Sequence, residues 1–338
     1  MTRRIAHLVQ DVTPGGVMRL VSFVEGSKGM LDLGTHEIIV CAGGLSRPPR
    51  TRADVIVSHM GLSQRNLPFY AALRAWNPGT PLVYVEHGYS EAFMESEVPL
   101  KGRFRLLLGA SRYLFDRVVT ISGAQDAWLR RFARLDPRKT RLIRSCVDLG
   151  AFLALPPPPS KVRRVGAMGR LHRQKGFDVL VEAFRRVDRP DVSLEVFGGG
   201  EESDRLVTLA EGDPRITFHG HSPDPVHAMS AVDAVAMPSR WEPYGLVALE
   251  AMAAGRPILV APTDGMLDHV EAGAFPVPDL TPEAWGEALT DLCGGEVQYD
   301  ASGARLCRGR GGAVRGGLAE PAGRPADVAP VPPDRTRP

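Results

Sequence analysis

The sequence predicts an α/β protein of two domains, each built on a doubly wound parallel sheet, that face each other across a cleft. Short apolar segments alternate with helical patterns along most of the chain, which is typical of parallel strands connected by helices. This alternation occurs on both sides of four consecutive prolines, Pro156–Pro159, which favour a stiff, extended linker. A chain of 338 residues is also long enough for two domains of about 150 residues each.

Eleven apolar segments are the expected strands. In the first half they are Ile5–Val9, Glu37–Cys41, Val55–Val57, Leu82–Val85, Val118–Ile121 and Arg141–Ile143. In the second half they are Arg164–Ala167, Ser193–Phe197, Ile216–Phe218, Ala234–Met237 and Ile258–Val260. We therefore expect an N-terminal domain at 1–155, a Pro-rich linker at 156–160 and a C-terminal domain at 161–300. Ligands of doubly wound sheets bind beyond the carboxyl ends of the strands, so the site is expected between the domains.

The composition excludes several classes of protein. The formal net charge is only +2, which does not favour nucleic-acid binding. Cys41, Cys146, Cys293 and Cys307 lie far apart without zinc-site spacing, so we expect reduced thiols and a cytoplasmic protein. The N-terminus shows no signal peptide, and no apolar run approaches the ~18 residues of a spanning helix.

Residues 301–338 have a different composition from the rest of the chain. They contain thirteen Gly plus Pro, seven Arg, no Lys and no aromatic residue. Such a segment cannot bury a core, so we expect it to be disordered. Two interpretations stay open: a natural flexible tail, and an ending altered by a shifted reading frame in the coding sequence.

The stretch Pro238–Gly255 (PSRWEPYGLVALEAMAAG) carries two carboxylates, Glu242 and Glu250, with seven residues between them. It follows a strand and predicts a turn, then a helix over 245–254 that Gly255 ends. This order directs free backbone N–H groups at a bound anion. Glu250 lies among apolar residues, so a buried Glu250 needs a partner. The alternative is that Glu242 caps the helix and Glu250 is exposed.

Further segments of the second half share the pattern of one family. Val165–Ala183 (VGAMGRLHRQKGFDVLVEA) matches a G-R-L-x-x-x-K-G-x-D-x-L-x-E-A signature, and VFGGG, ITFHG and AGRPILVA follow in order. With the E-x7-E element, these blocks resemble the retaining glycosyltransferases of family four (glycosyl transferases group 1). The resemblance implies the GT-B fold, two Rossmann-like domains facing an interdomain cleft. The first domain is shorter than usual, because only GGLSRPPRTR stands where the family has a further strand and helix.

The resemblance implies a site for the diphosphate of a nucleotide sugar. Arg170 and Lys175, in the loop after the strand at 164–167, would neutralise the leaving diphosphate. Without the resemblance, a solvated basic loop is the preferred interpretation of both residues. The distal phosphate would meet the backbone N–H groups at the start of the later helix, those of Tyr244, Gly245, Leu246 and Val247.

The resemblance also assigns the two carboxylates. Glu250 would accept hydrogen bonds from the ribose hydroxyls, and Glu242 would contact the transferred sugar and steady its positive anomeric centre. We expect a front-face displacement in which the leaving phosphate helps to deprotonate the acceptor. No D-x-D-type metal site lies near the phosphate residues, so we expect a metal-independent reaction without a cofactor.

In the first domain, Gly15 and Gly16 follow the first strand, and His87 follows the fourth. The resemblance implies that the two glycines form a loop over the donor and that the imidazole lies near the donor sugar. A simple turn is the alternative for Gly15 and Gly16, and a structural role is the alternative for His87.

Residues 100–118 mix the basic residues Lys101, Arg103, Arg105 and Arg112 with an apolar face. A basic amphipathic helix can lie on an anionic membrane, and it can equally pack its apolar side on the sheet. Membrane contact would make the protein peripheral on the inner face of the membrane.

The expected function is transfer of a sugar from a UDP- or GDP-sugar to a saccharide or lipid-linked acceptor, in bacterial exopolysaccharide or cell-surface glycan synthesis. The alternative is a catalytically impaired protein of the same fold that binds a nucleotide sugar. A nucleotide-sugar epimerase of similar fold is a third interpretation.

Overall fold

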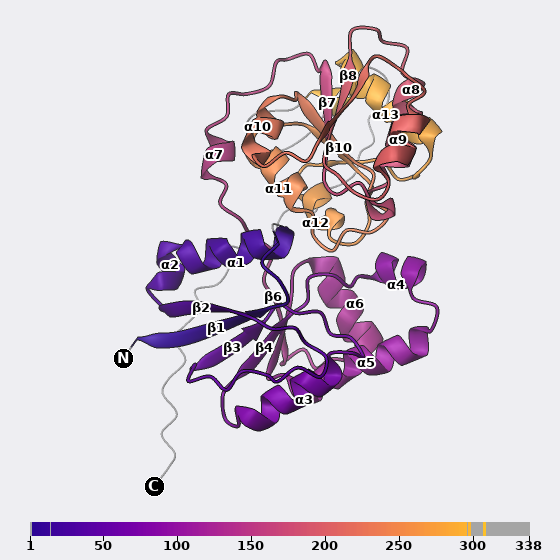
Figure 1. Ribbon diagram of the computed structural model, residues 1–338. Coiled ribbons are helices and arrows are strands. Elements are labelled where there is room, and N and C mark those ends of the chain that lie inside the picture. The colour runs from indigo at the N-terminus through magenta and orange to yellow at the C-terminus, as the bar shows by residue number, and fades with distance from the viewer. Residues whose placement is uncertain (1, 14, 296, 299–306, 309–338) are drawn as a thin grey trace.

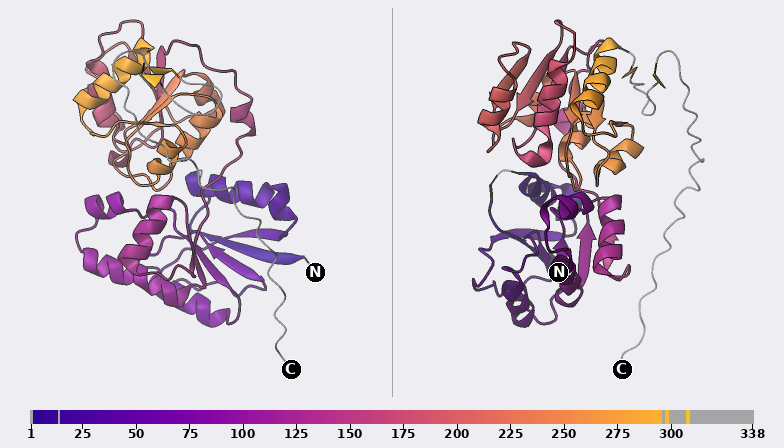
Figure 2. Two further views of the ribbon diagram at one scale, coloured as in Figure 1. Left: turned by 180° about the vertical axis from the view of Figure 1, so that it is seen from behind. Right: turned by 90° about the vertical axis from the view of Figure 1, so that its right-hand side faces the viewer.

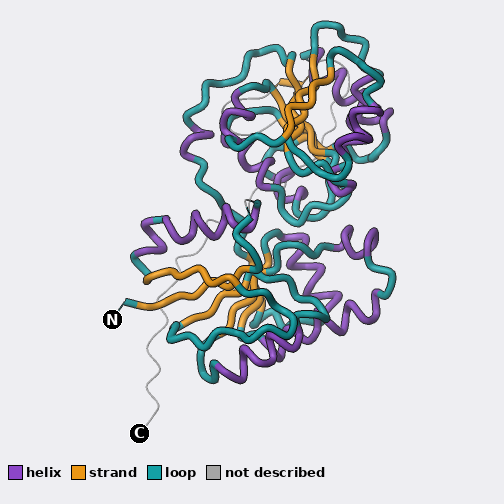
Figure 3. Tube along the Cα trace, in the orientation of Figure 1, coloured by secondary structure: helices purple, strands orange, loops and turns teal. Residues whose placement is uncertain are grey.

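A computed structural model describes residues 2–13, 15–295, 297–298 and 307–308. The chain forms two α/β domains, one above the other in Figure 1, each with a six-stranded sheet. Strands occupy the centre of each domain and helices lie outside them (Figure 3). The predicted α/β class with two parallel sheets is therefore confirmed.

The N-terminal sheet has the strand order β2-β1-β3-β4-β5-β6, and every neighbouring pair is parallel. Its strands are β1 (Arg3–Val9), β2 (Gly34–Val40), β3 (Val55–Ser58), β4 (Leu82–Val85), β5 (Arg117–Thr120) and β6 (Thr140–Leu142). Its helices are α1 (Gly16–Gly26), α2 (Lys28–Leu31), α3 (Leu67–Trp76), α4 (Glu91–Glu97), α5 (Lys101–Leu114) and α6 (Gly123–Ala133). Residues 41–54 form no helix or strand, so β2 stays at the edge of a compact sheet.

The C-terminal sheet has the order β12-β11-β10-β7-β8-β9 and is also parallel throughout. Its strands are β7 (Arg164–Met168), β8 (Ser193–Phe197), β9 (Ile216–Gly220), β10 (Ala234–Met237), β11 (Ile258–Val260) and β12 (Phe275–Pro276). The α-helices are α7 (Gly150–Leu153), α8 (Phe177–Arg185), α9 (Ser203–Leu209), α10 (Pro225–Ser230), α11 (Leu246–Ala253), α12 (Met266–Glu271) and α13 (Pro282–Gly294), and the 3₁₀ helix η1 spans Arg173–Lys175.

All eleven predicted strands form, with ends that differ from the prediction by at most three residues. The apolar runs are easy to recognise because helices cover both faces of each sheet, so consecutive strand residues are buried, as in β10. The prediction missed β12, since two residues carry no detectable pattern.

The chain passes between the sheets earlier than the predicted linker at 156–160. Phe152 of α7 is buried in a cluster with Met168, Met229 and other residues of the C-terminal domain. The carbonyl of Pro156 also accepts a hydrogen bond of 2.6 Å from Arg256. The passage therefore lies between β6 and α7, and the Pro156 carbonyl already contacts the C-terminal domain.

Most of the predicted disordered tail, 301–338, lies outside the described residues. The part that is described, β14 (Cys307–Arg308), pairs antiparallel with β13 (Val297–Gln298). This short pairing differs from the expectation of disorder at these two positions.

The order of the strands determines where a ligand can bind. In the C-terminal sheet the chain builds outward from β7 to β8 and β9, then returns to the other side of β7 with β10. A crevice opens at such a reversal, beyond the carboxyl ends of the two central strands. The loops after β7 and β10 meet there, below the C-terminal sheet and facing the N-terminal domain (Figures 1 and 2).

Candidate active site

A cavity of about 630 Å³ lies between the two domains and is lined by residues of both. This volume is in the usual range for small-molecule sites. Eight of the residues predicted from the sequence line it: Gly16, His87, Arg170, Lys175, Glu242, Tyr244, Gly245 and Leu246. Gly15, Val247 and Glu250 do not line it. Gly15 is the N-cap of α1, and the other two belong to α11.

Two cations lie on the loop after β7. Arg170 is exposed and forms no ion pair with any described residue, so its guanidinium is available to an anion. Lys175 ends the 3₁₀ helix η1, which starts where the His172 ring accepts a hydrogen bond of 3.0 Å from the Gln174 backbone. Gly176 then takes a φ of +66°, which lets the chain turn directly into α8.

Lys175 forms an ion pair with Glu242, the first carboxylate of the E-x7-E element. Glu242 is only 7% exposed, and its carboxylate also accepts a 3.2 Å hydrogen bond from the Ser239 hydroxyl. Its backbone N–H donates to Asp264, at 3.2 Å. The carboxylate is therefore held at the wall of the cavity beside a cation.

The N-terminus of α11 points toward the same cavity. Gly245 caps the helix with a φ of +90°, and a Cβ there would lie 2.7 Å from the sulfur of Met266, so only glycine fits. The N–H groups of residues 244–247 donate no hydrogen bond within the described part of the chain. Free N–H groups at a helix start favour a bound anion.

Glu250 lies one turn further along α11 and is 2% exposed. Its partner is Arg19 of α1, so the ion pair joins the two domains. Burial raises the pKa of Glu250, and the positive charge of Arg19 offsets part of that rise. The sequence predicted that a buried Glu250 needs a partner, but it did not identify Arg19. The one feature of the sequence that points to Arg19 is its place in the helix that follows Gly15 and Gly16.

His87 is presented by a rigid loop after β4. The buried carboxylate of Glu86 accepts hydrogen bonds from the backbone N–H groups of Gly88 (2.8 Å) and Tyr89 (2.9 Å) and from the Tyr84 hydroxyl (2.5 Å). Burial lowers the pKa of His87 to about 4, so the ring is neutral at pH 7. Its Nε2 atom lies 2.9 Å from Nδ1 of His59.

Asp264 and Asp268 also join the domains, and the sequence analysis singled out neither. The buried Asp264 accepts hydrogen bonds from the Ser90 hydroxyl (2.7 Å) and the Ala92 N–H (3.1 Å), at the start of α4. Asp268 accepts from the Gly123 N–H at the start of α6, at 3.1 Å, and from Arg144, at 2.7 Å. Asp264 lies just before α12 and Asp268 in its first turn, where an aspartate is common in sequences, so these pairings are visible only in the folded chain.

Apolar contacts close the same boundary. Val85, Val119 and Ile121, at the ends of β4 and β5, form a cluster with Tyr244 and Leu246 of the other domain. A Cβ on Gly16 would lie 3.4 Å from Leu246. The structure is thus a closed arrangement of the two domains around the cavity.

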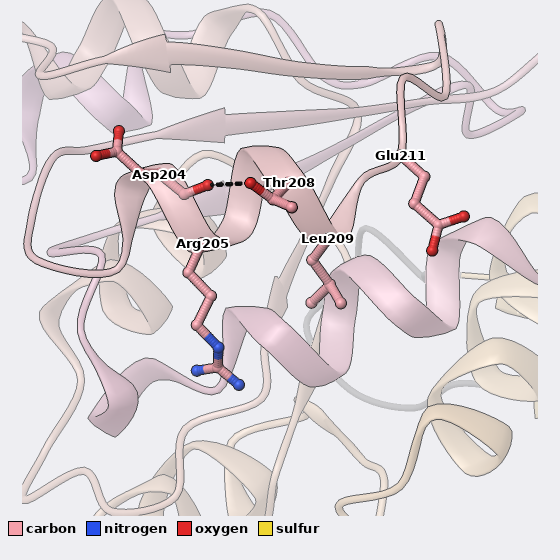
Figure 4. A pocket seen from close by; sticks show the side chains of 5 residues that line it. All are labelled: Asp204, Arg205, Thr208, Leu209 and Glu211. Carbon is pink, nitrogen blue, oxygen red and sulfur yellow. Dashed lines mark hydrogen bonds between the residues drawn. The ribbon is translucent and has the colours of Figure 1, made fainter.

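A different depression lies on the outside of the C-terminal domain (Figure 4). It is lined by Asp204, Arg205, Thr208, Leu209 and Glu211, and the Thr208 hydroxyl donates to the backbone carbonyl of Asp204 at 2.9 Å. Arg205 pairs with Glu202, and Glu211 pairs with Arg185. These charges are neutralised by their neighbours, so this depression offers no comparable binding chemistry.

Within the described part of the chain, no group of three or more His, Cys, Asp or Glu side chains is arranged as a metal site would require. No described helix is both long and apolar enough to cross a membrane.

The predicted amphipathic segment 100–118 is shorter as a helix than expected. The helix α5 ends at Leu114, and Arg117 already begins β5. One face of α5 packs on the N-terminal core through Phe104, Leu107 and Leu108. The packing of its apolar side on the sheet, one of the two expected arrangements, is therefore present.

Two facing parallel-sheet domains, with a cavity between them that is lined by cations and a helix start, define a protein of the GT-B class with a site suited to a phosphorylated ligand. Among solved structures, Anabaena HepE in complex with UDP-glucose has a TM-score of 0.67 at 20% identity, covering 85% of this chain and 88% of that chain. WaaG, a glycosyltransferase involved in lipopolysaccharide biosynthesis, has a TM-score of 0.63 at 17% identity, covering 86% and 90%. These likenesses confirm the GT-B fold.

The sequence comparisons give the family. The model of the family described as Glycosyltransferase Family 4 matches residues 35–151. The model of the family described as Glycosyl transferases group 1 matches residues 162–294. The D-inositol 3-phosphate glycosyltransferase of Pseudarthrobacter chlorophenolicus is 30% identical over 302 residues, covering 80% of this chain and 68% of that protein. Its namesake from Jonesia denitrificans is 33% identical over 274 residues, covering 70% and 62%. The chain belongs to glycosyltransferase family 4.

The matched region spans less than two thirds of some of these relatives. It covers 62% of the Jonesia denitrificans protein and 56% of the protein of that name from Segniliparus rotundus.

Proposed function

We propose that this chain is a metal-independent, retaining glycosyltransferase that moves a sugar from a nucleotide sugar to a saccharide or lipid-linked saccharide acceptor. The observation that carries this proposal is the convergence of Arg170, Lys175, Glu242 and the start of α11 on one interdomain cavity. These groups provide positive charge for a diphosphate and a carboxylate for a sugar within a single site.

In the proposed reaction, the acceptor hydroxyl attacks the anomeric carbon from the side of the leaving diphosphate. The bond between that carbon and the phosphate oxygen breaks, and the acceptor proton passes to the departing phosphate. Arg170, Lys175 and the N–H groups that begin α11 face the oxygen atoms that gain negative charge. Groups that stabilise developing charge lower the barrier most, so these groups contribute chiefly in the transition state.

Glu242 supports the positive charge that develops at the anomeric carbon. In the structure its carboxylate pairs with Lys175. When the diphosphate engages Lys175, Glu242 keeps its hydrogen bond from Ser239 and faces the sugar as a more negative group. Glu250 binds the ribose hydroxyls once Arg19 releases it, because Arg19 pairs with that carboxylate in the structure.

The charge that a metal ion supplies in other transferases comes here from Arg170 and Lys175. Both residues line the cavity, and Lys175 is near enough to Glu242 to remain positioned without a ligand. We therefore expect equal rates of donor turnover with and without EDTA. A rate that collapses in EDTA and returns with Mg²⁺ or Mn²⁺ would contradict metal independence.

The donor is a UDP- or GDP-sugar, and the comparisons favour the uridine nucleotide. The related solved structure of HepE is a complex with UDP-glucose, and another contains UDP and glucose. We place the reaction in bacterial exopolysaccharide or cell-surface glycan synthesis, which is in keeping with the lipopolysaccharide role named for WaaG.

A membrane surface is a proposed partner of α5. Its outer face exposes Leu106 and Tyr113, each 76% exposed, beside the exposed Arg103, Arg105 and Arg112. Apolar and basic side chains together favour an anionic bilayer. The full chain should sediment with anionic vesicles at low salt and less with zwitterionic ones. Sedimentation that is unchanged in a Leu106→Ser, Tyr113→Ser double variant would exclude this face.

The main experiment combines a donor screen with one substitution. UDP-, GDP- and ADP-sugars are tested for a rise in melting temperature, because a ligand that binds only the folded state stabilises it by RT ln(1 + [L]/Kd). The donor that binds is then assayed for transfer or hydrolysis in the wild type and in Glu242→Gln. We expect the variant to keep nucleotide binding and lose turnover, and the anomeric configuration of the product to match that of the donor.

Other outcomes have distinct meanings. Binding without turnover in the wild type supports the alternative, a catalytically impaired binding protein. Release of an epimerised sugar nucleotide indicates an epimerase. If no nucleotide sugar raises the melting temperature, the proposed function is wrong.

A further inference from the structure

Four histidines form a hydrogen-bonded row across the N-terminal sheet. His36 lies on β2, His7 on β1, His59 directly after β3 and His87 shortly after β4, and these four strands are neighbours in the order β2-β1-β3-β4. The nitrogen–nitrogen distances along the row are 2.9 Å, 3.0 Å and 2.9 Å. The row therefore connects the edge of the sheet with the cavity.

The sheet itself sets the spacing of the rings. Successive ring centroids are 5.2, 5.3 and 5.2 Å apart, with interplanar angles of 22° to 26°. Neighbouring strands lie about 4.8 Å apart, so one ring per strand gives this separation. Each ring consequently meets the next through one nitrogen on each side.

The far end of the row is a backbone carbonyl. Nε2 of His36 lies 3.1 Å from the carbonyl oxygen of Met30 at the end of α2, and this oxygen also accepts from the Leu33 N–H at 3.0 Å. A carbonyl oxygen can only accept, so His36 must carry its proton on Nε2.

The tautomer of His36 determines the tautomer of each following ring in the row. With a proton on Nε2, His36 accepts at Nδ1, so His7 donates from Nε2 and accepts at Nδ1. His59 then donates from Nε2 and accepts at Nδ1 from Nε2 of His87. Four neutral rings have four N–H groups, and these make the four hydrogen bonds of the row. The nitrogen left over is Nδ1 of His87, without a proton.

The opposite arrangement, in which each ring carries its proton on Nδ1, is unfavourable. It would place the lone pair of His36 Nε2 against the carbonyl of Met30 and lose one hydrogen bond. The penalty for such an unsatisfied pair corresponds to roughly a tenfold to hundredfold preference for the arrangement with the protons on Nε2.

The row is suited to fixing a tautomer rather than to conducting protons. Burial, with a smaller contribution from the neighbouring rings, lowers the pKa of His7 to about 4 and of His59 to about 2. At pH 7 His59 is therefore neutral. A positive charge passing through the centre of the row is therefore strongly disfavoured.

We propose that His36, His7 and His59 are positioning residues that hold His87 as its Nε2–H tautomer, so that Nδ1 accepts a hydrogen bond from a hydroxyl of the donor sugar. This inference rests on the proposed function, because it assigns His87 a donor sugar. A hydroxyl that donates to His87 keeps electron density on its oxygen, which favours the positive charge developing at the anomeric carbon. An N–H donated to that hydroxyl would have the opposite effect.

The test measures the tautomer and the kinetics in the full chain. Nitrogen-15 NMR of histidine-labelled protein reports which ring nitrogen of His87 carries the proton, with His87→Gln used to assign its signals. His36→Phe keeps a ring in the row but removes both hydrogen bonds. His36→Gln keeps a donor for the Met30 carbonyl and an acceptor for His7. The exposed His227, outside the row and the cavity, provides the matched control His227→Phe.

We expect an Nε2–H tautomer of His87 in the wild type and a mixture of tautomers in His36→Phe. The kcat of His36→Phe should fall about tenfold while KM for the donor changes less than threefold, and His36→Gln should recover most of this loss. A purely structural role for His36 would lower the melting temperature and leave the tautomer unchanged.

Two results would overturn the proposal: a wild-type His87 protonated on Nδ1, or a tautomer and kcat that do not respond to His36→Phe. Because the tautomer is measured in the free protein, it tests the row even if His36→Phe fails to fold. It also separates the two proposals, since a chain that transfers no sugar contradicts the proposed function and not the tautomer of His87.

Discussion

Replacing Arg170 by alanine tests the role of a cation in the cavity without disturbing the ligand-free protein. Arg170 is exposed and pairs with no carboxylate in the part of the chain that the structure describes. We therefore expect Arg170→Ala to change the free energy of unfolding by no more than about 0.5 kcal/mol. Loss of one preorganised group that stabilises developing charge costs about 2.7–4 kcal/mol, so kcat/KM should fall by about 10²–10³.

Lys175 provides an informative comparison, because it has a partner before any ligand binds. Its side chain is 18% exposed and pairs with Glu242, which is 7% exposed. Lys175→Ala leaves that carboxylate with the Ser239 hydroxyl as its remaining side-chain partner among the described residues. Besides the loss of kcat/KM, we expect the free energy of unfolding to fall by about 1.5–3 kcal/mol, the contribution of a hydrogen bond to a charged group.

The assay is donor transfer or hydrolysis at several donor concentrations, combined with urea unfolding of the same samples. Arg205→Ala is the matched control, since Arg205 lies on α9, pairs with Glu202 and is outside the cavity. It removes the same charge from the same domain. Turnover of Arg170→Ala within threefold of the wild type would refute the phosphate assignment. An equal loss in Arg205→Ala would show that net charge alone causes the effect.

Two further predictions concern interdomain and buried charges. Because Arg19 pairs with Glu250 in the structure, Arg19→Gln should make this carboxylate available and strengthen UDP binding by about threefold, a value typical of a partly exposed ion pair. Calorimetry showing tenfold weaker binding would mean that Arg19 contacts the nucleotide instead. Burial lowers the pKa of His7, His59 and His87 to about 4, 2 and 4, below the unfolded value near 6.5, so the unfolded state binds more protons as the pH falls. Stability should be unaffected above pH 7 and decrease between pH 6.5 and 5 by up to about 2 kcal/mol per histidine, and urea unfolding with equal stability at pH 7 and 5 would contradict this.

Local pattern determined much of the fold. Eleven of the twelve strands in the two six-stranded sheets were predicted, because most of them are short apolar runs that helices cover on both faces. The turn and helix of residues 238–255 were predicted from the positions of Gly245 and Gly255 in the sequence. In the structure these residues take positive φ values of +90° and +66°, which glycine adopts without strain. The family resemblance then identified the residues around the cavity, of which Arg170, Lys175 and Glu242 do converge there.

The sequence also determined that a carboxylate among apolar neighbours requires a partner, but it could not name that partner. Arg19 and Glu250 are separated by more than two hundred residues and meet only because the domains close on each other. The same holds for Ser90 and Asp264. The passage between the domains was misplaced for a related reason: four prolines define a stiff segment, whereas side-chain packing decides which domain it belongs to.

The histidine row shows most clearly the limit of prediction from the sequence alone. His7, His36, His59 and His87 have no common spacing in the chain, and each by itself is unremarkable in the sequence. The order of strands in the sheet places them side by side, and the Met30 carbonyl at one end gives the row a direction. The sequence by itself determined which strands and helices form, since these depend on near neighbours. Only the tertiary structure decided which distant polar groups meet, because strand order and domain closure are set by the packing of the whole chain.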